Sequence, residues 1–205
     1  MKIAVVGGTG DFGLALARQL VEAGHDVCIG SRDAARAAEK AAEVGASGAA
    51  NEDIGQGVDL VVLAVKAEAA VSTAELLAET ISSTPVLSVA SALRFTKNGV
   101  YPGDESRSLA ERTQDVLRAP VVAGLHSLAA ASLAQGKAPG DALVCGDDAG
   151  AKELALEVAA AVVTGRALDA GPLAGARALE GLTALIVNLN RRYRAHAGVQ
   201  VTGLA

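Results

Sequence analysis

The sequence predicts an α/β protein: a Rossmann-type doubly wound parallel sheet with a small C-terminal α/β extension. Three observations predict this fold. Short apolar runs rich in β-branched residues alternate with helical patterns through residues 1–90. A glycine-rich turn directly follows the first of these runs. The chain has 205 residues, of which 51% are hydrophobic, so one sizeable core can be buried.

Strands are predicted in the first half of the chain where an apolar run is uninterrupted, as in a parallel sheet covered on both faces. Helices are predicted where apolar residues recur at helical spacing, as Phe12, Leu16 and Leu20 do. In chain order this predicts strand 3–6, helix 11–23, strand 26–29, helix 33–44, a weak strand 47–50, strand 60–65, helix 67–81 and strand 86–90. Asn51 and Asp53 are expected to cap a short helix after the weak strand.

The second half of the chain has less regular patterns. Residues 94–106 are rich in Gly, Pro, Lys and Asp and are predicted to form a long loop. Helix 108–117, strands 121–124 and 142–145, helix 149–163 and helix 174–195 are predicted to follow. Asp147 or Asp148 is expected to cap the helix that begins at 149. The basic run 191–194 suits the C-terminal end of the last helix, where the helix dipole favours cations.

Composition and charge exclude several classes of function. The formal net charge of −5 argues against a nucleic-acid or anionic-membrane surface, because both favour basic proteins. No basic segment leads into an apolar stretch at the N-terminus, and no apolar run reaches spanning length. We therefore expect a soluble, cytoplasmic protein. Cys28 and Cys145 lie in separate apolar runs, which predicts buried free thiols rather than a disulfide or a zinc site.

A dinucleotide-binding turn is predicted at residues 7–13, where the chain reads GGTGDFG. The motif GxGxxG alone is weak evidence, but here it follows a buried strand and begins a helix. Gly8 is expected to allow the tight turn, Gly10 the approach of a pyrophosphate, and Gly13 close packing of helix and strand. The helix start at Asp11 and Phe12 then offers N–H groups to the phosphates. A glycine-rich turn without a ligand is the alternative.

The end of the second predicted strand favours NADP(H) over NAD(H). NAD-binding proteins usually carry an acidic residue there, which holds the ribose 2′-hydroxyl. This chain instead has Ser31 and Arg32, and Arg36 lies one helical turn further on. These donors suit a 2′-phosphate, and Thr9 can add another hydroxyl. The alternative is that both arginines are solvated helix charges and that Asp33 is only a helix cap.

Several segments along the chain resemble one enzyme family. The start of the chain, VVGGTG at 5–10 with GSR at 30–32, resembles NADPH:F420 oxidoreductases. Those enzymes pass a hydride between NADP and the deazaflavin coenzyme F420. Further likenesses are VVAGLH at 121–126, CGDD at 145–148, DAGPL at 169–173, NRRY at 190–193 and HAG at 196–198. They follow the family's order and cover most of the chain.

The resemblance implies co-substrates and sites. NADP(H) is the expected cofactor and coenzyme F420 the expected small-molecule redox partner, with no metal. Residues 1–120 are expected to form the NADP-binding domain, and residues 121–205 to complete the deazaflavin cleft and a dimer interface. The residues expected to bind cofactor are Gly8, Thr9, Gly10, Asp11, Phe12, Gly13, Ser31, Arg32, Arg36, Ala64, Val65, Lys66, Ser88, Ala90, His126, Ser127, Leu128 and Ala130.

His126 is the candidate catalytic residue. It follows the carboxyl end of an apolar strand, where doubly wound sheets bind ligands. The resemblance further favours a functional role for this histidine over a structural one. It is expected to orient the deazaflavin or to stabilise charge on it, and a purely structural hydrogen bond is the alternative. The sequence shows no Ser-His-Asp set, carboxylate pair or metal-ligand cluster. That suits hydride transfer, in which the cofactors carry the chemistry.

Two departures from the family leave the acceptor open. Lys66-Ala67 stands where the family has Pro-Trp, and prolines found in some members near Ser88 and Ala129 are missing. An NADPH-dependent reductase of another small acceptor (an imine, ketone or metal chelate) is therefore an alternative, with His126 or Lys66 as proton donor. A non-catalytic NADP-binding redox sensor is a second alternative. The last helix is largely apolar, which burial in the monomer core or a homodimer interface can explain, and we expect the homodimer.

Overall fold

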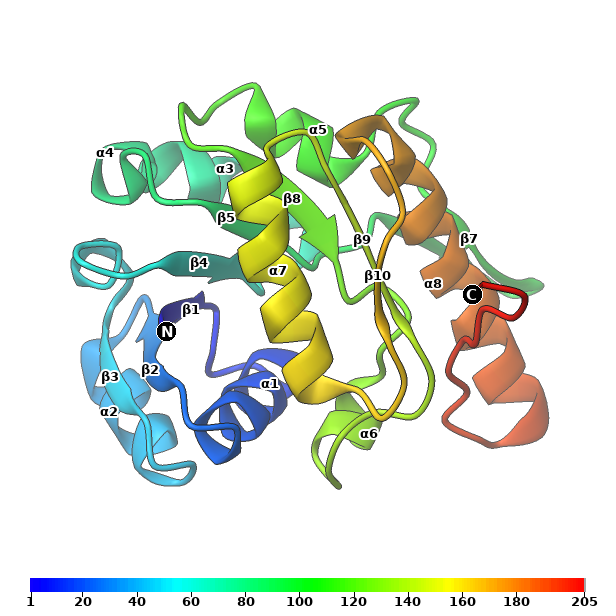
Figure 1. Ribbon diagram of the computed structural model, residues 1–205, viewed down its shortest axis with the longest axis horizontal. Coiled ribbons are helices and arrows are strands. Elements are labelled where there is room, and N and C mark those ends of the chain that lie inside the picture. Colours follow the sequence, from blue (N-terminus) through cyan, green and yellow to red (C-terminus); the bar gives the residue numbers. More distant parts are fainter. Residues whose placement is uncertain (205) are drawn as a thin grey trace.

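The computed structural model describes residues 1–204 and confirms the doubly wound α/β fold (Figure 1). Within these residues, eight strands form the main sheet in the order β10-β9-β8-β5-β4-β1-β2-β3. Neighbouring strands are parallel except for β8 and β9, which are antiparallel. The strands are β1 Lys2–Val6, β2 Asp26–Ser31, β3 Ser47–Ala50, β4 Leu60–Leu63, β5 Val86–Ser88, β8 Val121–Gly124, β9 Ala142–Gly146 and β10 Ala167–Asp169.

Helices cover both faces of this sheet (Figure 1). α1 packs against α6 and α7 on one face, whereas α3 and α8 both adjoin α5 on the other. The helices are α1 Asp11–Glu22, α2 Ala34–Ala42, α3 Ala67–Leu76, α4 Ala78–Ile81, α5 Leu109–Gln114, α6 Ala130–Leu133, α7 Ala149–Val162 and α8 Ala176–Tyr193, with 3₁₀ turns at Asn51–Asp53 and Leu173–Gly175.

Alternate residues of each strand point to opposite faces and build two apolar layers. In β1, Ile3 and Val5 join the layer that contains residues of α1 and α7. Ala4 and Val6 join the layer that contains residues of α3 and α5. Because β1, β4 and β8 lie inside the sheet and are buried on both sides, their sequences are nearly uninterrupted apolar runs, whereas the edge strands β3 and β10 are only partly buried.

The winding of the sheet reverses between β1 and β4. Val6, the last residue of β1, lies opposite Gly30 of β2 on one side and opposite Leu63 of β4 on the other. The helices that follow these strands cover opposite faces, so a crevice opens at the carboxyl ends of the strands. The glycine-rich turn after β1 lies at this crevice.

The loop predicted at 94–106 is wrong over residues 94–102, which belong to a β-hairpin. β6 (Leu93–Thr96) pairs antiparallel with β7 (Gly99–Pro102). Within residues 1–204 this pair is a sheet of its own, and it rests on α8. The Asn188 side chain on α8 accepts from the Val100 amide at 2.8 Å and donates to the Val100 carbonyl at 2.7 Å. The hairpin therefore depends on a contact that no local pattern in the sequence reveals.

Smaller differences from the predicted elements concern local geometry. The helix predicted at 67–81 breaks at Leu77 into α3 and α4, where no Gly or Pro marks the break. Asn51 and Asp53 lie inside a 3₁₀ turn and do not cap it; the cap position is Ala50. The short elements α6 and β10 were not predicted, because four and three residues are too few to show a period.

The paired aspartates before α7 are structural. Asp148 caps α7 through a first-turn amide at 2.8 Å, and Asp147 accepts from the amide that begins the second 3₁₀ turn at 2.9 Å.

Among residues 1–204, no group of three or more His, Cys, Asp and Glu side chains is placed to hold a metal ion. Cys145 is buried and Cys28 partly buried, and both are free thiols in this part of the chain. No helix within residues 1–204 combines the length and apolar character needed to cross a bilayer.

Candidate functional site

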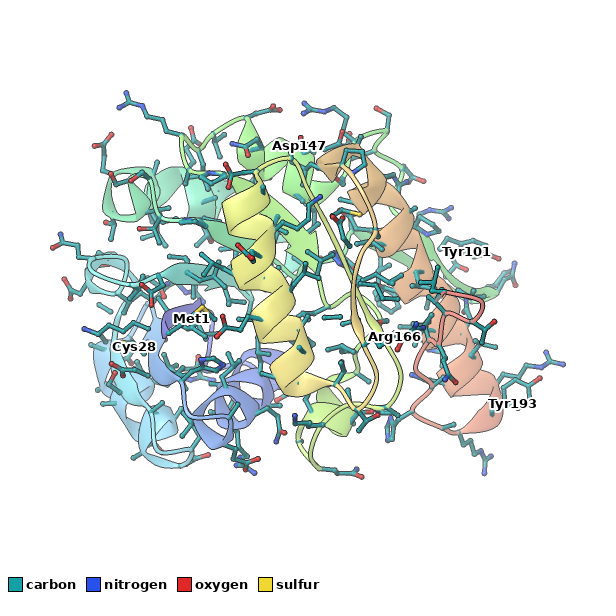
Figure 2. All side chains as sticks on the ribbon, viewed as in Figure 1. Met1, Cys28, Tyr101, Asp147, Arg166 and Tyr193 are labelled. Atoms are coloured by element: carbon teal, nitrogen blue, oxygen red, sulfur yellow. The ribbon has the colours of Figure 1, made fainter. Side chains whose placement is uncertain are left out.

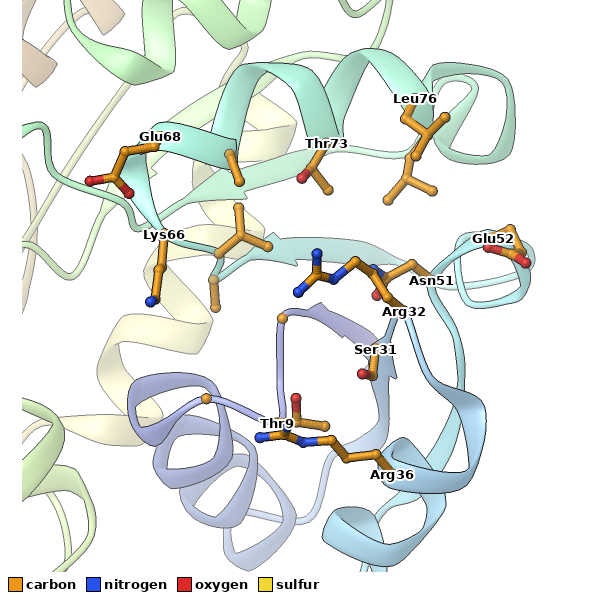
Figure 3. Close-up of a pocket in the computed structure, with 16 residues that line it drawn as sticks. Thr9, Ser31, Arg32, Arg36, Asn51, Glu52, Lys66, Glu68, Thr73 and Leu76 are labelled. Atoms are coloured by element: carbon orange, nitrogen blue, oxygen red, sulfur yellow. The ribbon is translucent and has the colours of Figure 1, made fainter.

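A cavity of about 570 Å³ opens at the carboxyl ends of β1, β2 and β4 (Figure 3). This is the switch point of the sheet, where doubly wound folds bind ligands, and the volume suits a small organic molecule. Its lining residues are Gly7, Thr9, Gly10, Ser31, Arg32, Arg36, Asn51, Glu52, Ala64, Val65, Lys66, Glu68, Ala69, Thr73, Leu76 and Leu77.

The left-handed residue of the glycine turn is Gly7, one position before the glycine expected to have that role. Gly7 has a φ of +79°, and a Cβ there would lie 2.7 Å from the Ala64 carbonyl oxygen. Gly8 instead allows close packing, because a Cβ would lie 2.7 Å from Cγ2 of Ile29. At Gly13 a Cβ would lie 2.7 Å from the Gly7 carbonyl oxygen. The fold itself therefore requires these three glycines.

Gly10 is different, because the described protein does not require a glycine there. Its φ of −82° and ψ of 163° are accessible to any residue. Among residues 1–204, a Cβ would meet only the Gly7 carbonyl oxygen, at an ordinary contact distance of 3.5 Å. No side chain in this range caps α1, which begins at the exposed Asp11, so its first N–H groups remain available to an anion. The backbone at Gly10 is therefore open to close approach from outside, as a phosphate would require.

The end of β2 and the start of α2 place two arginines at the cavity (Figure 3). The Asp33 carboxylate caps α2 by accepting from the amides of Ala35 at 2.9 Å and Arg36 at 3.2 Å. Ser31 is 9% exposed and accepts from the Asp33 amide at 3.3 Å, which leaves its hydroxyl hydrogen to donate elsewhere. Arg32 and Arg36 are exposed, and neither forms an ion pair within residues 1–204. Two such guanidinium groups beside a hydroxyl donor suit a phosphate dianion.

The opposite wall of the cavity comes from the segment after β4 and from α3. Ala64, Val65 and Lys66 were expected there and do line the cavity. The sequence did not indicate the further lining residues Gly7, Asn51, Glu52, Glu68, Ala69, Thr73, Leu76 and Leu77. Residues 69, 73 and 76 follow helical spacing and so share one face of α3. That spacing is visible in the sequence, but the direction in which the face points is not.

A smaller cavity of about 240 Å³ adjoins the start of α3. Its lining residues are Ala67, Glu68, Val71, Ala92, Leu93, Gly103, Leu109 and Arg112. Glu68 lines both cavities, so the two lie on either side of the first turn of α3. The position at which this chain departs from the family, Lys66-Ala67, thus contributes one residue to each cavity.

Other predicted residues lie at the carboxyl ends of β5 and β8, where the side chains are buried. The two strands are neighbours, with Ser88 opposite Ala123. His126 is 5% exposed, and its Nε2 lies 3.2 Å from the Ala90 carbonyl oxygen. Because a carbonyl only accepts, we assign the hydrogen to Nε2 and leave Nδ1 unprotonated. Within residues 1–204, neither Nδ1 nor the Ser88 hydroxyl has a hydrogen-bond partner.

Burial decides the charge of His126. Desolvation lowers its pKa from 6.5 to about 4, and the hydrogen bond to Ala90 opposes this only in part. The imidazole is therefore neutral at pH 7 and offers an acceptor at Nδ1 rather than a positive charge. Unpartnered buried polar atoms are costly to a protein alone. Ser88 and His126 do not line either of the two cavities described above, and co-substrate contacts at these residues stay predictions.

The remaining predicted residues lie around the same strand ends. Phe12 and Leu128 are partly buried against the core layer that contains α1. Ser127 is 3% exposed and donates to the Asp141 carbonyl oxygen at 3.1 Å. Ala130 is the first residue of α6. Cofactor contacts at these positions stay predictions.

Known proteins match this chain along its whole length. Residues 2–92 match the family described as NADP oxidoreductase, coenzyme F420-dependent. The F420-dependent NADP reductase of Methanothermobacter thermautotrophicus is 36% identical over 100% of this chain and 96% of its own length. The F420-dependent NADP reductase of Methanocaldococcus jannaschii is 33% identical over 100% of this chain and 99% of its own.

Solved structures agree with this likeness. A putative F420-dependent NADP reductase from Arthrobacter sp. FB24 has a TM-score of 0.85 at 26% identity, and the match covers 99% of this chain and 100% of that one. An imine reductase from Streptomyces aurantiacus has a TM-score of 0.64 at 20% identity, with 95% of this chain and 62% of that one covered. At that identity the second likeness concerns the fold alone.

Proposed function

Because this chain belongs to the family of coenzyme F420-dependent NADP oxidoreductases, we propose that it transfers a hydride between NADP(H) and F420 in the crevice at the switch point. One observation carries the choice of nicotinamide cofactor. Arg32 and Arg36 stand beside the buried Ser31, at the strand end where an acidic residue holds the ribose of NAD. A 2′-phosphate supplies a negatively charged partner for these two arginines.

The larger cavity is the proposed site for the adenosine half of NADP(H). Ser31, Arg32 and Arg36 hold the 2′-phosphate, with Thr9 as a further hydroxyl. The N-terminus of α1 holds the pyrophosphate over Gly10, where the protein leaves space for it. The face of α3 on the other side of the cavity covers the adenine. The fit of the residues to the cofactor is therefore both electrostatic and steric.

The nicotinamide and the deazaflavin are proposed to stack near Ser88 and His126. When bound, the two rings would supply the hydride donor and the hydride acceptor. The protein contributes placement and the exclusion of water. Ser88 offers a hydroxyl donor and the neutral His126 an acceptor at Nδ1, so together they can orient an amide or ring edge. His126 thus orients a co-substrate and does not act as an acid at pH 7.

A direct assay tests this function. Purified protein is mixed with NADPH and oxidised F420, and the absorbance of the oxidised deazaflavin is followed, with NADH in a parallel reaction. We expect rapid bleaching with NADPH and much slower bleaching with NADH. Tight NADPH binding without bleaching contradicts F420 as the acceptor. Equal rates with NADPH and NADH contradict the role given to the arginines.

Pairing of two copies through one apolar face is part of the proposal. Leu185, Leu189 and Tyr193 recur at four-residue spacing on α8 and are 56%, 38% and 68% exposed. Phe95 and Tyr101 of the adjoining hairpin are also exposed, and Tyr101 and Tyr193 lie on the same flank of the molecule (Figure 2). A contiguous apolar patch of this kind is typical of an interface between copies.

Size-exclusion chromatography with light scattering tests the pairing. The wild-type protein is expected at twice the mass of one chain, and the double variant Leu185→Glu with Leu189→Glu at the mass of one chain. Leu204→Glu is the control, because Leu204 is 55% exposed but lies outside α8 and the hairpin. A monomeric wild-type protein contradicts the pairing.

A cytoplasmic location completes the proposal. Fractionation of cells that produce the protein, followed by detection with an antibody, tests it. Recovery in a membrane or secreted fraction contradicts this part of the proposal.

A further inference from the structure

Thr183, on α8, contacts both segments that follow β5 and β8. Its Oγ1 lies 2.8 Å from the carbonyl oxygen of His126 and 2.8 Å from the Oγ of Ser91. Ser91 follows Ala90, whose own carbonyl oxygen faces the His126 ring. One hydroxyl thus joins the segment that follows Ser88 to the segment that contains His126.

The direction of these hydrogen bonds follows from the number of donors. Thr183 has one hydroxyl hydrogen and the His126 carbonyl can only accept, so Thr183 donates to it. Oγ1 of Thr183 then accepts, and Ser91 is the donor. The Leu179 carbonyl, one turn earlier on α8, is a more distant acceptor at 3.4 Å. The result is a directed chain from Ser91 through Thr183 to the backbone of His126.

A buried carboxylate on α8 holds the same part of the chain. Glu180 lies one turn before Thr183 and is 1% exposed. Its carboxylate accepts from the Ala92 amide at 3.3 Å and from the Leu109 amide at 2.6 Å. Because residues three apart share a helix face, one face of α8 fixes the chain at Ser91 and at Ala92.

The backbone beside the His126 carbonyl is strained. Leu125, directly before His126, has a φ of +65°, which branched side chains rarely adopt. A conformation of this kind persists only where its surroundings over-determine it. Burial of Leu125, which is 1% exposed, is one such constraint. The hydrogen bond from Thr183 to His126 is another.

We propose that Thr183 is a positioning residue for hydride transfer. It sets the separation between the segment after β5 and the segment after β8, and with it the place where the two rings meet. The proposal rests on the function proposed above, because a reaction between two stacked rings needs this separation to be held. Thr183 acts through Ser91 and His126, not by touching the reacting atoms.

Thr183→Val tests the proposal, because it removes the hydroxyl and keeps the shape of the side chain. We expect kcat for F420 reduction to fall about tenfold, with KM for NADPH within about twofold of the wild-type value, because the adenosine half binds elsewhere. Thr183→Ser retains the hydroxyl and is expected to restore most of kcat. Thr113→Val is the matched control, because Thr113 is also on a helix but its hydroxyl is buried without a partner in residues 1–204.

Two further measurements keep the test decisive. Ser91→Ala removes only the donor to Thr183, is expected to lower kcat about threefold, and serves if Thr183→Val does not fold. NMR signals of the His126 amide and ring are expected to shift in Thr183→Val and not in Thr113→Val. A wild-type protein that does not reduce F420 overturns the proposed function itself. If the wild type reduces F420, and Thr183→Val has the same kcat and the same His126 signals as the wild type, the role of Thr183 is overturned and the proposed function is not.

Discussion

Around the larger cavity, at the carboxyl ends of β1, β2 and β4, the arginine side chains are exposed, whereas the polar side chains at the ends of β5 and β8 are buried. Arg32 and Arg36 extend from the surface without ion-pair partners in residues 1–204. Ser88 and His126 are enclosed, at 0% and 5% exposure, and α8 holds their surroundings. The first region can attract a phosphate by charge, and the second can place neutral rings by shape.

This difference teaches how each region is expected to respond to change. A flexible charged side chain still attracts a phosphate when its exact position varies, so changes there alter affinity. Placement of two rings within reaction distance tolerates little displacement, so changes there alter turnover. Buried polar groups that form hydrogen bonds also contribute to stability, whereas exposed arginines contribute only weakly.

The glycine turn gives the largest expected effect, because its glycines serve the ligand and the fold separately. Gly10→Ala is expected to weaken NADPH binding about a hundredfold, since its Cβ stands where a phosphate approaches. Its free energy of unfolding is expected to change by less than about 0.5 kcal/mol, because that Cβ makes an ordinary contact. Fluorescence titration with NADPH and urea denaturation measure the two effects.

Gly13→Ala is the matched contrast to this variant. Its Cβ would lie 2.7 Å from a backbone oxygen, so we expect a loss of about 2 kcal/mol in the free energy of unfolding. Normal NADPH binding by Gly10→Ala would remove the main steric reason for placing the pyrophosphate at this turn.

The arginines give the next effect. Arg32→Ala and Arg36→Ala are each expected to raise KM for NADPH about tenfold, because each removes a charge-assisted hydrogen bond to the 2′-phosphate. KM for NADH is expected to stay the same, because NADH lacks that phosphate. Steady-state kinetics at low and high salt measure both, and the NADPH value of the wild type should rise with salt.

Arg118→Ala is the control for the arginine variants. Arg118 is also exposed, but it does not line the larger cavity. Its KM values are expected to match the wild type for both cofactors. Equal losses with NADH and NADPH in Arg32→Ala would contradict a 2′-phosphate site.

His126 is expected to make the stability of the protein depend on pH, because its ring is buried. Its pKa is about 4 when folded and 6.5 ordinarily, so between these values the unfolded chain binds a proton that the folded chain excludes. The contribution of the neutral His126 ring to the free energy of unfolding is therefore fully present above pH 6.5 and is lost as the pH falls toward 4. Between about pH 7.5 and pH 5, we expect a loss of about 2 kcal/mol in the free energy of unfolding.

Urea denaturation of the wild type and of His126→Gln at both pH values measures this contribution. The variant lacks the titrating ring, so its loss of stability over the same range is expected to be smaller. The other titrating groups are common to both proteins and cancel in the comparison. The same pH dependence in both proteins would mean that His126 is not a buried neutral group.

Ser88→Ala has the smallest expected effect on stability. The hydroxyl has no partner in residues 1–204, so its removal is expected to change the free energy of unfolding by less than about 0.5 kcal/mol. Ser127→Ala is the contrast, with an expected loss of about 1 kcal/mol, because that buried hydroxyl donates to the Asp141 carbonyl. A fall in kcat with unchanged stability in Ser88→Ala would sharpen its proposed role toward the co-substrate.

Much of the fold was predictable, and the misses share a cause. The strands of the main sheet were found from their apolar runs, apart from the three residues of β10, because burial on both faces leaves a local signature. The hairpin was missed, because its support comes from Asn188, eighty-eight residues from Val100. In the site, Ser31, Arg32 and Arg36 could be named because they follow a recognisable strand. Leu76 could not, since nothing local tells which way its helix faces.

The sequence by itself determined the doubly wound sheet, the glycine turn and the positive charge at the end of β2. Each of these depends on residues within one strand–turn–helix unit, whose geometry follows from local sterics and periodicity. Only the tertiary structure decided that a Cβ at Gly10 would meet no close internal contact, that His126 is buried and neutral, and that Thr183 joins it to Ser91. Those properties arise where segments distant in the chain pack together, and burial and hydrogen bonding there depend on neighbours that no local pattern names.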